Sequence, residues 1–175
     1  MRVTGFVTAA ALVFSAAIGV YAQAPNLTGK WTLVPAAAPA DAAAAPAGGG
    51  GRGGGRGGGG GGNPFGQEFT ATQDATSLVI TRMQGDATVT ATYKLDGSES
   101  KNMVPGRGGE TEQVSKATVV GTTIVITTSI NAGGNTIEQK RVLSMDAGGN
   151  LVVEQTAPGR GGGEPTTTKI TYKKG

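Results

Sequence analysis

The chain has 175 residues, a formal net charge of +3, and neither cysteine nor histidine. So small a net charge gives no strong field for nucleic acid or an acidic membrane. The missing residue types exclude thiolate and imidazole metal sites, a Ser-His-Asp triad, a Cys-His pair and a redox dithiol. We therefore expect no metal and no other cofactor. Carboxylate chemistry remains open, but an enzyme is disfavoured, and we expect no enzymatic activity.

Residues 1–22 have the pattern of a secretory signal peptide. A basic start is followed by the apolar run Val3–Val20 and by small residues that signal peptidase prefers. We expect cleavage after Ala22, because cleavage after Ala24 would leave Pro25 directly behind the cut bond. The alternative is an uncleaved anchor, since about 18–20 apolar residues can span a bilayer. With cleavage, the protein is expected to be periplasmic or extracellular, without stable membrane insertion.

One strand and a long insert are expected next. Residues 23–34 contain a short alternating segment that Pro35 ends, and they are assigned to the first β-strand. Residues 35–64 combine prolines among alanines with a glycine run, and they predict a disordered insert. Arg52 and Arg56 lie in that run. Because two arginines neutralise only about two phosphates, a flexible tether is favoured over an RNA-binding segment, and no nucleic-acid partner is expected.

Residues 65–175 show a period of two that predicts a β-meander body. In Ala87–Leu95, for example, apolar side chains alternate with threonines and a lysine, as a half-buried strand requires. Segments rich in glycine, asparagine and aspartate separate the strands and indicate short hairpin turns. With the first strand, the pattern predicts about ten strands, at residues 28–34, 67–73, 77–83, 87–95, 99–104, 112–120, 122–130, 136–145, 151–157 and 166–173.

The fold class is therefore all-β, an antiparallel meander of about eight to ten strands. Because no helical pattern is present to cover the apolar face of the sheet, the sheet must close on itself or fold over. Closure into a barrel is favoured because it removes exposed edges, and a β-sandwich is the alternative. The interior is expected to hold few aromatic rings, from Trp31, Phe65, Phe69, Tyr93 and Tyr172.

The segment Asn26–Trp31, NLTGKW, resembles the Gly-x-Trp opening of lipocalin and avidin-type barrels, with Gly29 and Trp31 at the motif positions. In those families the tryptophan plugs one end of the barrel under a basic residue from the last strand. The resemblance thus implies a structural barrel-end role for Gly29 and Trp31, with Lys169, Lys173 or Lys174 as the basic partner. Most of the chain also resembles exported bacterial proteins of unknown function that share "TGKW", a Gly/Arg-rich insert and a "YKLDGSES…PGRGG" stretch.

Two near copies of a Pro-Gly-Arg-Gly-Gly segment, at residues 105–110 and 158–164, suggest a second kind of site. Alternate loops of a meander emerge at one end, so both segments and the insert are expected to share a rim. That rim would carry Arg52, Arg56, Arg107 and Arg160. Successive glycine amides and arginines bind anions, so an acidic polymer is a candidate partner. The alternative is that these segments are only soluble turns.

Candidate carboxylate pairs such as Glu110 and Glu112 flank a turn and are expected to point to opposite faces, which disfavours acid–base catalysis. The predicted function is an exported, non-catalytic binding protein, a lipocalin-like module for a small apolar or amphipathic ligand. The alternative is a structural or cell-envelope interaction protein that uses the Gly/Arg-rich rim.

Overall fold

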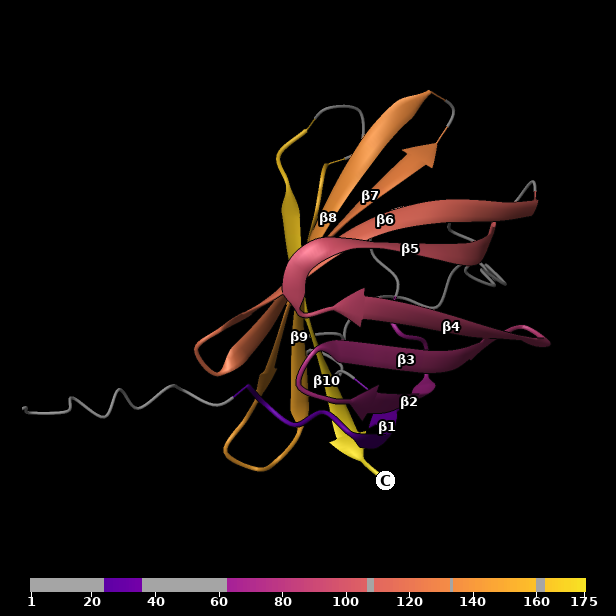
Figure 1. Ribbon diagram of the computed structural model, residues 1–175. Coiled ribbons are helices and arrows are strands. Elements are labelled where there is room, and N and C mark those ends of the chain that lie inside the picture. The colour runs from indigo at the N-terminus through magenta and orange to yellow at the C-terminus, as the bar shows by residue number, and fades with distance from the viewer. Residues whose placement is uncertain (1–23, 36–62, 107–108, 133, 160–162) are drawn as a thin grey trace, which may run out of the picture.

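The computed structural model describes residues 24–35, 63–106, 109–132, 134–159 and 163–175. Within these ranges the protein is all-β, and its ten strands form a nearly closed antiparallel barrel (Figure 1). The predicted fold class is thereby confirmed, with the barrel rather than the sandwich. The predicted signal peptide, residues 1–22, lies outside the described residues, as do residues 36–62 of the predicted insert. In the described part, no helix is long and apolar enough to cross a membrane.

Each strand pairs with its neighbours in the chain except at β4 and β5, which are the two edges of the sheet, and the first strand pairs with the last. The order across the sheet is β4-β3-β2-β1-β10-β9-β8-β7-β6-β5, so β1 lies beside β10. The strands are β1 (Gly29–Leu33), β2 (Glu68–Gln73), β3 (Ser77–Gln84), β4 (Ala87–Lys94), β5 (Asp96–Gly106), β6 (Gly109–Val120), β7 (Thr123–Ala132), β8 (Asn135–Met145), β9 (Leu151–Ala157) and β10 (Thr166–Lys174).

The alternating pattern places one set of side chains inside the barrel and the other in solvent. On β4, Val89 and Tyr93 are buried, whereas the threonines between them are exposed. Threonine and β-branched residues favour such pleated, half-buried strands. The short turns use glycine where a positive φ is needed, as at Gly85 and Gly121.

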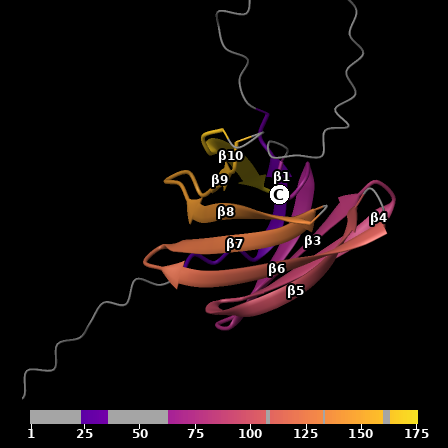
Figure 2. The ribbon, with the colours of Figure 1, turned by 90° about the horizontal axis from the view of Figure 1, so that it is seen from above.

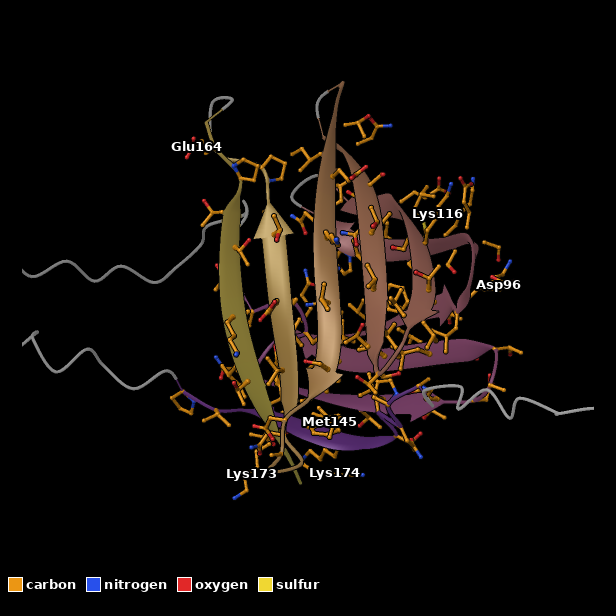
Figure 3. All side chains as sticks on the ribbon, turned by 90° about the vertical axis from the view of Figure 1, so that its left-hand side faces the viewer. Asp96, Lys116, Met145, Glu164, Lys173 and Lys174 are labelled. Atoms are coloured by element: carbon orange, nitrogen blue, oxygen red, sulfur yellow. The ribbon has the colours of Figure 1, made fainter. Side chains whose placement is uncertain are left out.

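The barrel has two different ends (Figure 3). At the Trp31 end, named after the residue that fills it, lie the β2–β3, β4–β5, β6–β7 and β8–β9 turns and the C-terminus. At the insert end lie the strand ends that the other five connections join, including the end of β1 and the start of β2 on either side of residues 36–62. Figure 3 shows Met145, Lys173 and Lys174 at the Trp31 end and Glu164 at the insert end.

The seam between β4 and β5 is closed by side chains rather than by a backbone ladder. The Asn102 side chain accepts a hydrogen bond from the Thr92 amide at 2.8 Å and donates one to the Thr92 carbonyl at 3.1 Å. Ser100 Oγ accepts from the Lys94 amide at 2.9 Å. An irregularity between Asp96 and Glu99 shifts the register of β5 where it turns away from β4. Figure 2 shows β4 and β5 close together along this side of the barrel.

Candidate functional site: the polar belt inside the barrel

The Trp31 end is filled by side chains and leaves the insert end as the candidate binding region. Trp31 is 0% exposed, and its indole N–H donates to the Leu27 carbonyl at 2.8 Å. Lys174 is the β10 partner of Trp31, and its Nζ lies 5.8 Å from the centroid of the Trp31 ring. Of the three lysines named as candidate partners, the structure therefore brings Lys174 to Trp31.

The main apolar core extends from Trp31 to the middle of the barrel. It consists of Leu27, Trp31, Phe65, Phe69, Ala71, Leu78, Ile80, Tyr93, Leu95, Ala117, Ile124, Ile126, Leu143, Leu151, Val153, Ile170 and Tyr172. All five aromatic residues expected in the interior belong to it. The described part of the lumen is thus packed with side chains in the half nearer the Trp31 end.

Above this core, toward the insert end, the inner face becomes polar. Six inward-facing residues on five consecutive strands form what we call the polar belt: Ser100, Ser115, Thr128, Gln139, Arg141 and Gln155. Cross-strand register aligns them, since Ser100 pairs with Ser115, Ser115 with Thr128 and Thr128 with Gln139. The hydroxyl oxygens of Ser115 and Thr128 lie 3.0 Å apart.

Arg141 is the centre of the polar belt. Its Nε donates to Gln155 Oε1 at 3.1 Å, Nη2 donates to Gln139 Oε1 at 3.0 Å, and Nη1 donates to Thr128 Oγ1 at 3.5 Å. The residue is only 8% exposed. Register explains the arrangement, because Arg141 on β8 is opposite Gln155 on β9. The belt therefore holds a guanidinium group inside the barrel through neutral partners.

The charge of Arg141 is not matched by a protein carboxylate in the described ranges. Eleven of the twelve acidic residues are described, and every one of them is exposed; the twelfth, Asp41, lies outside these ranges. The three ion pairs found there join exposed side chains on the outer face, Lys30–Glu68, Lys101–Glu112 and Lys116–Glu99. A buried charge without an opposite charge is costly, so Arg141 is the clearest departure from a purely structural interior.

The ionisable tyrosines of the described interior do not cancel the charge of Arg141. Burial lowers the pKa of Arg141 from its ordinary value; the nearby phenols of Tyr93 and Tyr172 oppose this shift, and Arg82 adds to it. Burial raises the pKa of Tyr93, and it raises the pKa of Tyr172 to about 12. Both tyrosines are therefore neutral at physiological pH, while Arg141 remains charged.

An aromatic cluster covers one side of Arg141. The Phe65 ring centroid lies 5.9 Å from the Arg141 Cζ, 5.0 Å from the Phe69 ring and 6.3 Å from the Tyr172 ring. Phe65 comes from the segment just before β2 and is only 2% exposed. The Tyr172 hydroxyl donates to the Gly66 carbonyl at 3.3 Å and holds this segment in place. Phe65 thus enters the barrel from the insert end.

Beyond the polar belt, the insert end presents aliphatic side chains again. Val89, Val104, Ile130, Ile137 and Ala157 occupy inward-facing positions there, and we call them the aliphatic rim. Asn102 and Gln113 also face inward at this end and interrupt the rim on β5 and β6. None of the five belongs to the main core cluster. Ile137 is 38% exposed. The interior is therefore divided into an apolar floor, a cationic polar belt and an aliphatic rim.

The predicted Gly/Arg rim was defined by four arginines. Arg52, Arg56, Arg107 and Arg160 all lie outside the described residues. The strand ends that flank residues 36–62, 107–108 and 160–162 do lie together at the insert end.

The expectation for the carboxylate pair was wrong. Glu110 and Glu112 are two residues apart on β6, so they point to the same face rather than to opposite ones. Both are exposed and line a hollow of about 330 Å³ on the outer face with Ser129, Asn131 and Thr136. Two further hollows, of about 330 and 310 Å³, are also lined mainly by outward-facing residues. In the described ranges, no cluster of three or more acidic residues could hold a metal ion.

Arg141 and Arg82 were missed by the sequence analysis, although the alternation contains a signal for both. Arg141 has the same parity as Ile137 and Leu143, and Arg82 has the same parity as Leu78 and Ile80. An arginine in phase with the apolar positions of a strand indicates an inward-facing cation.

No known family model and no curated protein matches this chain.

Proposed function

We propose that this protein is an exported, non-catalytic binding protein that takes up a small amphipathic molecule at the insert end of its barrel. The observation that carries the proposal is the order of the interior surfaces, in which an aliphatic rim lies above a polar belt with a buried cation. A molecule with an apolar part and a polar head has the matching order of surfaces. Binding sites of this kind are apolar with a few placed polar groups.

Displacement of Phe65 would supply room for such a ligand. The Phe65 side chain contributes roughly 150–250 Å² of buried surface, as is usual for aromatic residues. It belongs to an irregular segment held by the Tyr172–Gly66 hydrogen bond and by the Leu33 amide, which donates to the Gln67 carbonyl at 2.7 Å. Such short segments are more easily displaced than a paired strand.

The test is binding of octan-1-ol and octanoate to the exported protein, measured by titration calorimetry. In the Ile137→Asp variant we expect the affinity for both to fall by about tenfold or more, because a carboxylate would replace part of the aliphatic rim. Val120→Asp is the matched control, since Val120 is 58% exposed at the Trp31 end. Equal effects of the two substitutions, or no binding to the unaltered protein, would contradict the proposal.

The alternative function is contact with an acidic polymer of the cell envelope through Arg52, Arg56, Arg107 and Arg160. The location of the flanking strand ends at one end of the barrel supports it. This role needs no ligand inside the barrel, so it is favoured if the unaltered protein binds neither octyl compound.

A further inference from the structure

We propose that the ligand of the barrel is a carboxylate and that Arg141 binds its head group. This inference rests on the proposed function and specifies its ligand class. The carboxylate would lie against the polar belt, and the apolar part of the ligand would follow the aliphatic rim toward the insert end.

The hydrogen-bond inventory of Arg141 supports a carboxylate. A guanidinium group has five N–H donors, and three of them are used by Gln155, Thr128 and Gln139. Among the described residues, one N–H on each terminal nitrogen has no further protein acceptor. Two donors on a planar fork match the two oxygens of a carboxylate, which is the geometry that makes arginine–carboxylate pairs strong.

The distribution of charge supports the same class of ligand. Arg141 and the half-buried Arg82 face inward, whereas each described acidic side chain is exposed to solvent. An arginine placed in the interior without an acidic partner costs stability relative to an apolar residue of similar size. A ligand carboxylate would supply the opposite charge, and in a site of low polarity that charge is worth more than at the surface.

Phe65 leaves the donors of Arg141 available. Its ring contacts the guanidinium group through the π face, and such a contact uses no N–H donor. The Tyr93 phenol lies near Arg141, and each group shifts the pKa of the other. The phenol makes no hydrogen bond to the described residues, so its O–H offers a further donor.

The experiment compares three ligands with the same tail: octanoate, octan-1-ol and octyl phosphate. We expect the unaltered protein to bind octanoate about 10- to 100-fold more tightly than octan-1-ol, the range for hydrogen bonds to a charged group. Arg141→Gln should remove this difference, because it should weaken octanoate binding far more than octan-1-ol binding. Lys140→Gln is the matched control, because it removes the neighbouring positive charge on the outer face of the same strand and should preserve the difference.

A second measurement does not depend on the folding of a variant. In the unaltered protein, octanoate should shift the NMR signal of one arginine Nε–H group, assigned to Arg141, and octan-1-ol should leave it in place.

Asp41→Asn tests the one acidic residue that lies outside the described ranges. Octanoate affinity should be unchanged in this variant, and a tenfold rise would show that Asp41 is the natural partner of Arg141 and would overturn the inference.

The remaining outcomes separate this inference from the proposed function. Equal affinity for octanoate and octan-1-ol would overturn the carboxylate assignment and leave an amphipathic-ligand protein. Tighter binding of octyl phosphate than of octanoate would also overturn it. Binding of none of the three would overturn the proposed function itself.

Discussion

At the residue scale, the Trp31 end depends on the absence of a side chain at Gly29. Gly29 has a φ of +146°, and a Cβ built there would lie 2.7 Å from Lys174 Cε. The Lys174 side chain passes over Gly29, and its Nζ lies beside the Trp31 ring. The spacing of glycine and tryptophan in the sequence therefore has a physical basis, since glycine gives the lysine stem room to reach the ring.

Replacement of Gly29 by alanine should lower the free energy of unfolding by about 1–3 kcal/mol, the usual cost of a strained backbone conformation. Urea denaturation of the variant measures this change. The double variant Gly29→Ala/Lys174→Ala separates two causes. If backbone strain dominates, removing the lysine restores little stability, whereas full recovery would show that the contact with Lys174 alone requires glycine.

At the element scale, the β4–β5 seam replaces a backbone ladder with two polar side chains. Asn102 presents one acceptor and one donor to Thr92, as a residue in a neighbouring strand would. Asn102 is buried, so these groups cannot exchange their partners for water. The seam is therefore the part of the barrel in which two side chains, Asn102 and Ser100, take the place of backbone pairing.

Asn102→Leu should destabilise the protein by about 1–3 kcal/mol, because the N–H and the C=O of Thr92 each lose a partly buried partner. Amide hydrogen exchange at Thr92 should become faster in the variant. Lys101→Ala is the matched control on the outer face of the same strand, and it should change stability by less than about 1 kcal/mol, since its ion pair with Glu112 is exposed. Unchanged exchange at Thr92 in Asn102→Leu would contradict the role assigned to the seam.

The sequence pattern predicted the number and order of the strands, and most of their ends agree within one or two residues. The exceptions are β5 and β6, expected at 99–104 and 112–120 but found at Asp96–Gly106 and Gly109–Val120. Pro105 and the Asp96-Gly97-Ser98 segment were assigned to turns from residue type alone. Pro105 is compatible with the β5 edge strand, and the Asp96 segment forms a register irregularity within the strand. Local turn preference was overridden there by pairing with β6.

At the scale of the whole molecule, the interior changes character along the barrel axis. An apolar floor fills the Trp31 end, the polar belt crosses the middle, and the aliphatic rim lies at the insert end. The fold class follows from alternation, which each strand shows by itself. The polar belt does not follow from alternation, because β8 has polar side chains on both faces around Lys140 and Arg141. Which of these faces is inside becomes clear only when register with Thr128 and Gln155 is known.

The central claim is that this interior binds a small organic acid, and native mass spectrometry of the protein purified from its own host tests it most directly. We predict a stoichiometric adduct whose mass corresponds to an amphipathic carboxylic acid, present on the unaltered protein and on Lys140→Gln but absent from Arg141→Gln. Recovery of the unaltered protein only as the bare polypeptide, or with a ligand that Arg141→Gln retains, would contradict the claim.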